Sequence, residues 1–169
     1  YHKQPQKSIA RSGLTNYQRN ERPVFGALSD WRNVPGSYQM DATQADIYLV
    51  SRHDRSKMIG CPYIYLAVDT VTQLIAGLYV GLECDESAVM LCLANAAQNK
   101  VAFCREYRIE IAPTQWPSRG LPHEIITDTG SEFFGSRMQE LCQKYGVEIQ
   151  SLPPFRPDGK GLVEKSFDL

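Results

Sequence analysis

Three carboxylates stand out in the sequence because each lies beside a short apolar stretch. Asp41 is near the start of a predicted first strand, Asp128 follows the apolar run EIIT directly, and Glu164 lies on a predicted last helix. If the first and fourth predicted strands are neighbours, Asp41 and Asp128 face one another and the helix can bring in Glu164. Such a cluster suits phosphoryl transfer, because two divalent cations about 3.5–4 Å apart can activate an attacking oxygen and stabilise the leaving one. Carboxylate ligands favour a hard cation such as Mg²⁺.

Each acidic residue also has a plainer interpretation. Asp128 precedes Thr129 and Gly130, and an aspartate in that setting can simply bond the backbone N–H groups of a turn. Asp69, which precedes the turn-like stretch TVTQ, is interpreted as such a turn residue. Other acids and aromatic residues are interpreted as solvated, turn-forming or packing residues: Asp46, Glu132, Asp158, Trp31 and Trp116.

The composition indicates a single compact domain. The chain has 169 residues, of which 43% are hydrophobic and 22% charged, enough to bury a core without help from a cofactor. Five cysteines without a C-x-x-C pair favour neither a disulfide framework nor a zinc finger, and they fit a reducing cytosol. No apolar run approaches the roughly 20 residues of a membrane span, so we expect a soluble intracellular protein.

Charge is distributed unevenly along the chain. Residues 1–22 hold five basic residues against one acid, Glu21, while the whole chain carries a formal charge of −1, so the remainder is acidic. We therefore expect a basic arm or linker over residues 1–36 and a catalytic core over residues 37–169, with its last helix cut short by the chain end. An acidic body can handle phosphates only through local basic patches or bound cations.

The hydrophobic pattern predicts an α/β fold with the element order β-β-β-α-β-α-β-α. It gives a five-stranded mixed sheet with helices on both faces and an extended first hairpin with a basic tip. Asp85 is a predicted N-cap, Ser136 and Gln139 a predicted capping box, and Gly146 a predicted C-cap. The predicted strands cover 38–51, 61–69, 74–83, 123–128 and 147–152, and the predicted helices cover 86–107, 136–145 and 162–169.

Three segments together resemble a known family. YQMDAT, IITDTGSEF and PPFRPDGKGLVEKSF resemble the signature blocks of the DDE transposase and retroviral-type integrase core, which has the ribonuclease H-like fold. The 35 residues between Asp128 and Glu164 match the spacing in integrases and many insertion-sequence transposases. The stretches DATQADIYLVSR and ANAAQNKVAFCREY are most similar to TnsB-type bacterial transposases, relatives of the Mu transposase. The 86 residues between Asp41 and Asp128 exceed the retroviral pattern, largely through the first hairpin.

The resemblance implies a function and a set of partners. Asp41, Asp128 and Glu164 would bind two Mg²⁺ ions, replaceable by Mn²⁺, in a transposase core that cleaves transposon ends and joins their 3′-OH groups to target DNA. The implied partners are transposon-end DNA, target DNA, further copies of the chain on DNA and accessory transposition proteins, in the bacterial cytoplasm at the nucleoid and without a membrane. Candidate DNA contacts, each of which can instead be a solvated cation, are Arg156, Lys160, Lys165, Arg52, Arg55 and Lys57.

Two alternatives remain open from the sequence. A hydrolytic ribonuclease H-like nuclease would use the same three acids, and a catalytically silent module for DNA binding or assembly would use none of them. The presence of all three carboxylates favours an enzyme.

Overall fold

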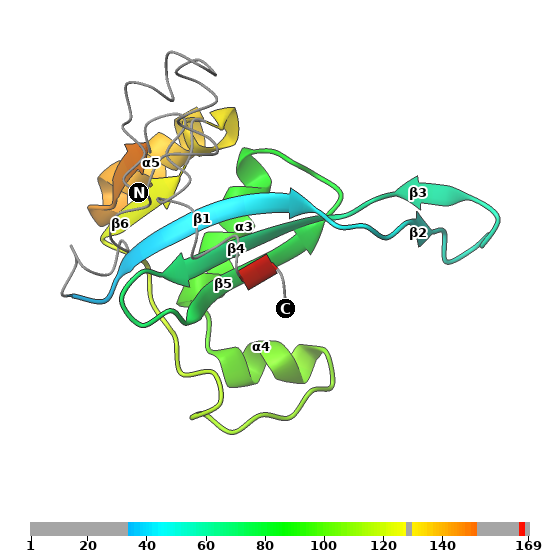
Figure 1. Cartoon of the computed structure of the whole chain (residues 1–169), viewed down its shortest axis with the longest axis horizontal. Coiled ribbons are helices and arrows are strands. Elements are labelled where there is room, and N and C mark those ends of the chain that lie inside the picture. Colours follow the sequence, from blue (N-terminus) through cyan, green and yellow to red (C-terminus); the bar gives the residue numbers. More distant parts are fainter. Residues whose placement is uncertain (1–33, 128–129, 152–165, 168–169) are drawn as a thin grey trace, which may run out of the picture.

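A central five-stranded sheet organises the chain in the computed structural model, which describes residues 34–127, 130–151 and 166–167. Strands β1 (Ser37–Gln44), β4 (Tyr63–Asp69) and β5 (Ile75–Gly81) form an antiparallel meander. Strands β6 (Glu124–Thr127) and β7 (Glu148–Ser151) continue the sheet in parallel, in the order β5-β4-β1-β6-β7 (Figure 1). The predicted mixed sheet is confirmed, and so is the predicted pairing of the first strand with the fourth, here β1 with β6.

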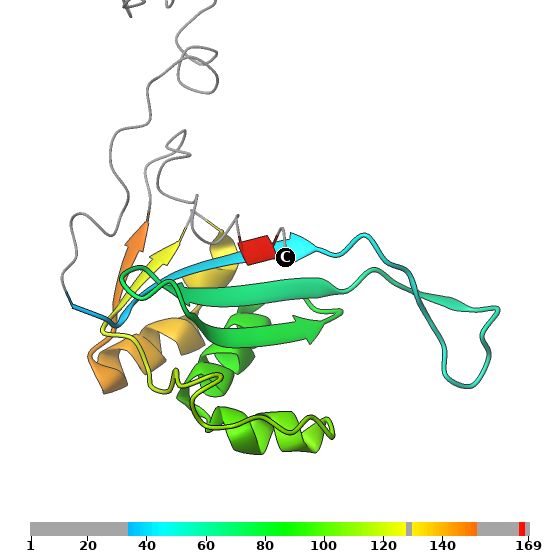
Figure 2. The same cartoon turned by 60° about the horizontal axis from the view of Figure 1, so that its bottom comes forward.

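One face of the sheet carries the main hydrophobic core. Successive strand residues point to opposite faces, and Met40 of β1 and Tyr65 of β4 are buried in one cluster with Leu93 of α3 (Glu86–Ala97). Helix α3 approaches closely at Gly77, where a Cβ atom would lie 2.5 Å from the Cys92 carbonyl oxygen. Figure 2 shows α3 and α5 (Ser136–Tyr145) on this same side of the sheet.

The opposite face carries a smaller cluster. Leu66 and Val68 of β4 are buried there, and Phe167 packs against them. Ser166 and Phe167 are helical and are the described part of the predicted last helix. The rest of that helix, which the prediction of helices on both faces requires, lies outside the described residues.

The prediction of one long strand over 38–51 at the start of the first hairpin is wrong. Strand β1 ends at Gln44, and a separate two-stranded ribbon follows, formed by β2 (Leu49–Val50) and β3 (Met58–Gly60). Ala45 N–H donates to the Pro62 carbonyl, but Pro62 has no N–H to return a ladder bond, so the regular pairing stops there. The ribbon projects from the body as a slender arm (Figures 1 and 2).

The single helix predicted over 86–107 is wrong, because the chain forms two helices. Helix α3 ends at Ala97, and α4 (Lys100–Glu106) begins after an extended Gln98. Asn99 caps α4 by accepting the Ala102 N–H, while the Lys100 ammonium donates to the carbonyl oxygens of Asn95 and Ala96 at the end of α3. Burial lowers the pKa of Lys100 to about 8. Asn99 therefore caps the start of α4, Lys100 caps the end of α3, and these adjacent caps separate the two helices.

The capping box predicted at Ser136 and Gln139 is also wrong. Gly135 is the N-cap of α5 and contributes no side-chain hydrogen bond, so Ser136 is already the first helical residue. The Met138 N–H donates instead to Oε1 of Glu86, 2.6 Å away, at the start of α3. A carboxylate at this position also complements the positive end of the helix dipole.

Two other helix ends agree with the sequence. The Asp85 side chain accepts the Ala88 N–H at the start of α3, and Gly146 ends α5 with a left-handed φ of 67°.

Among the helices of the described ranges, none has both the length and the apolar character needed to cross a bilayer. The predicted basic arm falls mainly in residues 1–33, outside the described chain, and the boundary after residue 36 stays a prediction.

Candidate catalytic site

Asp41 lies in the middle of the sheet. It is a residue of β1, pairs with Leu66 of β4, and is half-buried. Because directly paired strand residues share a face, Asp41 lies on the face that carries Leu66, opposite the main core. One of its carboxylate oxygens, Oδ1, accepts the Ala42 N–H at 2.9 Å. A carboxylate on this face is thus presented by a rigid central strand.

Strand β6 brings a second chain segment alongside β1. The two strands are parallel, Gln39 pairs with Ile126, and β6 ends one residue later at the buried Thr127. The carboxyl end of β6 therefore lies next to the part of β1 that leads to Asp41. Asp128, the next residue in the sequence, lies outside the described residues.

The remaining predicted site residues on the C-terminal side are untested. Glu164 and the candidate DNA contacts Arg156, Lys160 and Lys165 all lie outside the described residues. Within the ranges that are described, no group of three histidine, cysteine or acidic side chains is placed to hold a metal ion. The three-carboxylate site therefore stays a prediction, of which the structure describes the Asp41 position.

Asp69 has the turn role that the sequence predicted. Its Oδ1 accepts the backbone N–H groups of Val71 and Thr72, at 3.0 and 2.7 Å, and its Oδ2 accepts the Gly36 N–H at 2.6 Å. These bonds fasten the β4–β5 turn to the start of β1. Burial raises the pKa of Tyr38, and the nearby Asp69 carboxylate raises it further. This buried acid is therefore occupied in holding the fold.

The tip of the first hairpin carries its expected cations. Arg52, Arg55 and Lys57 are all exposed. Asp54 lies between them, and its Oδ2 is 4.0 Å from the Lys57 ammonium. Hydrogen bonds from the Ser56 side chain and backbone lower the pKa of Asp54, so the acid stays ionised and offsets part of the positive charge. The tip is basic, but less so than its arginine and lysine content suggests.

The segment after β6 has an anchor that sequence reasoning missed. Phe133, in the short 3₁₀ helix Ser131–Phe133, is buried in the main core. Two residues later, Gly135 lies directly against the Glu86 carboxylate, where a Cβ atom would clash with it. The same Glu86 carboxylate accepts the Met138 N–H. Because Glu86 is far from both Gly135 and Met138 in the sequence, no local pattern could reveal these contacts. They fix the end of the connection between β6 and α5.

The fold places the chain in a broad class of proteins. A chain of the simian T-cell lymphotropic virus intasome, in complex with the PP2A regulatory subunit B56 gamma, matches it with a TM-score of 0.56 and 16% identity, over 99% of this chain and 51% of that one. The mixed five-stranded sheet with its helices has the ribonuclease H-like α/β fold.

Sequence comparison narrows the class to a family. The TnsB C-terminal domain model matches residues 39–169. The chain is 39% identical over 163 residues to the Tn7 transposition protein TnsB of Escherichia coli, covering 95% of this chain and 23% of that protein. It is 26% identical over 131 residues to the transposase for transposon Tn552 of Staphylococcus aureus, covering 77% of this chain and 24% of that protein. The chain belongs to the TnsB C-terminal domain family, and it spans about a quarter of the length of these relatives.

Proposed function

We propose that this chain is the catalytic core of a DNA transposase and that Asp41, Asp128 and Glu164 form its acidic triad. The observation that carries the proposal is the position of Asp41, on the central strand β1 and beside the carboxyl end of β6, in a member of the TnsB family. Asp128 follows the last residue of β6 directly in the sequence. Its place in the chain therefore supports a second carboxylate at this point of the sheet.

The described end of the chain supports the third member. Phe167 packs against Leu66 and Val68, on the sheet face that Asp41 shares. Glu164 precedes Phe167 by three residues, a spacing that keeps two residues near each other on a helix. The C-terminal segment thus returns to the face on which the proposed site lies.

The donor set fits a hard divalent cation. Asp41 offers a half-buried carboxylate, and oxygen donors of this kind are those that Mg²⁺ prefers. Two Mg²⁺ ions held by Asp41, Asp128 and Glu164, with Mn²⁺ as a substitute, would supply the positive charge that favours attack by an oxygen nucleophile at phosphorus.

The proposed reaction has two displacements at phosphorus. Water attacks a phosphodiester at the transposon end, the bond from phosphorus to the 3′ oxygen breaks, and a 3′-OH is released. That 3′-OH then attacks a target phosphodiester, forms a new bond to phosphorus and displaces a target 3′-OH. Both steps need in-line positioning and charge neutralisation, so no protein nucleophile takes part.

The proposed DNA contacts lie on two segments. Arg52, Arg55 and Lys57, at the tip of the first hairpin, are exposed and can reach phosphates. Arg156, Lys160 and Lys165 flank Glu164 in the sequence. We extend the proposal to transposon-end and target DNA as substrates, to assembly of several copies on DNA with accessory transposition proteins, and to action at the bacterial nucleoid.

The test combines metal binding with catalysis. Mg²⁺ and Mn²⁺ should raise the thermal midpoint of the wild-type chain, because a ligand that binds only the folded state stabilises it. Asp41→Asn should remove that rise, while Asp46→Asn, at an exposed bend of the same segment, should keep it. Equal metal-dependent rises in the wild type and in Asp41→Asn would remove Asp41 from the site.

A strand-transfer assay separates the proposed function from its rivals. With a pre-cut transposon end and a supercoiled target, a transposase joins the two DNAs, whereas a nuclease nicks the target without joining. A silent module does neither with Mg²⁺ present. Joining that depends on Asp41 supports the proposal. Nicking without joining would indicate a nuclease, and the absence of both activities would indicate a silent module.

A further inference from the structure

The hairpin arm, defined here as residues 47–59, exposes far more apolar surface than a solvated ribbon needs. Tyr48 and Met58 are each 71% exposed and Ile47 is 57% exposed, although they lie within a few residues of the basic tip. A two-stranded ribbon alone is marginally stable in water, and clustered exposed apolar side chains mark a surface that contacts another molecule. The apolar residues of the arm are Ile47, Tyr48, Leu49, Val50, Met58 and Ile59.

DNA is a poor partner for the stem of this arm. Phosphates are bound by cations and by N–H or O–H donors, which the tip offers through Arg52, Arg55 and Lys57, whereas the apolar side chains of the stem offer only the Tyr48 hydroxyl. The stem needs an apolar surface to cover it. A protein surface meets that need, and this chain presents a suitable one.

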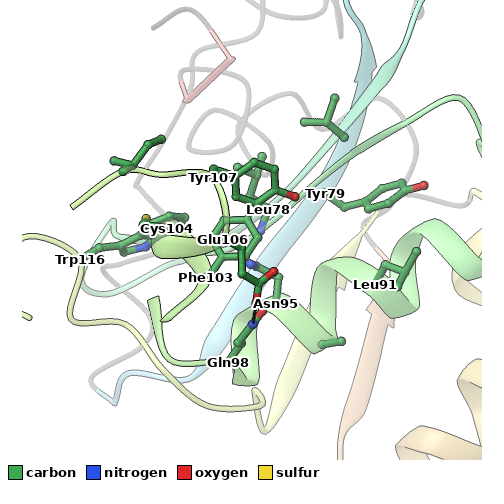
Figure 3. Close-up of a pocket in the computed structure, with 13 residues that line it drawn as sticks. Leu78, Tyr79, Leu91, Asn95, Gln98, Phe103, Cys104, Glu106, Tyr107 and Trp116 are labelled. Atoms are coloured by element: carbon green, nitrogen blue, oxygen red, sulfur yellow. Dashed lines mark hydrogen bonds between the residues drawn. The ribbon is translucent and has the colours of Figure 1, made fainter. Parts of the chain in front are cut away.

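An open apolar groove lies at the far edge of the sheet, between β5, α3 and α4. It has a volume of about 830 Å³. Figure 3 shows aromatic and aliphatic side chains from the three elements converging on it. Several of them are half or more exposed, including Leu91 at 50% and Tyr107 at 64%. The apolar walls of the groove are made chiefly by Leu78, Val80, Leu91, Phe103, Tyr107 and Trp116.

The groove also contains polar groups. Asn95, which is 5% exposed, accepts the Leu78 N–H through Oδ1. Among the described residues that line the groove, Glu106 alone carries a charge. The site thus favours an apolar segment with a nearby cation.

We propose that the hairpin arm of a second copy of this chain docks in this groove. The arm supplies the required chemistry: extended backbone, apolar side chains and, at its tip, Arg52, Arg55 and Lys57 to approach Glu106. The arm projects away from its own body (Figures 1 and 2), so it leaves the groove of its own chain open. A contact between two different surfaces propagates head to tail. The inference does not depend on the catalytic assignment.

Complementation between two defective variants tests the proposal. Tyr48→Asp with Met58→Asp disables the arm, and Leu91→Glu with Tyr107→Glu disables the groove; all four side chains are exposed. In sedimentation experiments over a concentration series, the wild type should associate beyond a dimer. Each double variant alone should associate at least about tenfold more weakly. An equimolar mixture should form a dimer and stop there, because one intact arm meets one intact groove.

The mixture also controls for folding, since a dimer forms only if one variant keeps a folded groove and the other a folded arm. Tyr145→Asp, an exposed aromatic substitution on α5, is the matched control and should associate like the wild type. A wild type that stays monomeric at every concentration overturns the proposal. So does continued association of the groove variant, which would indicate arm-to-arm contact, or of the arm variant, which would indicate groove-to-groove contact.

Discussion

The two faces of the sheet are built in opposite ways. On the helix side, Met40, Tyr65 and Leu93 are at most 1% exposed and belong to one large apolar cluster. On the other side, the buried cluster is reduced to Leu66 and Val68 with Phe167 at its margin, and Asp41 stands beside it as a half-buried acid. Among the described residues, the main core thus lies on one side of the sheet, and the other side carries the Asp41 carboxylate. Substitutions on the two faces should therefore separate stability from chemistry.

The largest expected effect is on chemistry alone and comes from Asp41→Asn. Removing one carboxylate of the proposed triad should lower strand transfer by about a thousandfold or more, comparable to the loss of a key electrostatic group elsewhere. The unfolding midpoint without metal should stay unchanged or rise, because like charges clustered without a cation repel. The joining rate measures the effect of Asp41→Asn on the reaction, and thermal unfolding measures its effect on stability. A large loss of stability would show that Asp41 supports the fold rather than the reaction.

The helix face should show the reverse pattern in Leu93→Ala. Leu93 is fully buried in the main core, and truncating such a side chain costs about 3 kcal/mol of unfolding free energy. Leu91, two residues away on the same helix but half exposed, provides the control, since Leu91→Ala should change stability by less than about 0.5 kcal/mol. Denaturant titration measures both. Joining activity per folded molecule should remain that of the wild type in Leu93→Ala, and a selective loss of that activity would show that this core residue also affects the reaction.

The sequence predicted most of this architecture because the relevant signals were local. Runs of β-branched and aromatic residues at strand length marked the strands of the meander, and the short connections between them indicated antiparallel neighbours. The caps at Asp85 and Gly146 and the turn at Asp69 followed from side-chain chemistry within a few residues. The break between α3 and α4 was missed because the apolar spacing continues through it. What ends α3 is a local competition in which Asn99 caps the next helix.

The candidate site was less accessible to prediction. Asp41 could be proposed as a site residue because the family motif and the strand pattern agreed there, and its catalytic role stays a prediction. The contact of Glu86 with Gly135 and Met138 joins distant parts of the chain, so no periodicity or cap pattern carries it. The groove beside β5 is equally invisible in the sequence, since it depends on how α4 and Trp116 pack back on the sheet edge.

A third prediction concerns the contact between α3 and the start of α5, on the helix side of the sheet. Glu86→Ala removes the acceptor of the Met138 N–H and should cost about 1 kcal/mol, the usual value of a helix N-terminal cap. Gly135→Ala should cost about as much in the wild type, because its Cβ would displace the flexible Glu86 carboxylate from the Met138 N–H, and less once Glu86 is alanine. A double-mutant cycle by denaturant titration measures this coupling. Glu140→Ala, an exposed acid on α5, is the control, and strict additivity of the first two substitutions would show that the contact is unimportant in solution.

The last prediction concerns a small change in stability on the Asp41 face, at Phe167. This side chain is only partly buried, so Phe167→Ala should cost about 1 kcal/mol, well below the fully buried case. Because Phe167 rests on Leu66, the cross-strand partner of Asp41, it ties the C-terminal segment to the proposed site. The midpoint of Mg²⁺-dependent stabilisation should therefore move to higher metal concentration, while Tyr145→Ala on α5 should leave it in place. Thermal unfolding over a Mg²⁺ series measures both variants. If Phe167→Ala lowers stability but leaves the metal response unchanged, packing and chemistry are independent even on this face, and the contrast between the two faces is one of burial alone.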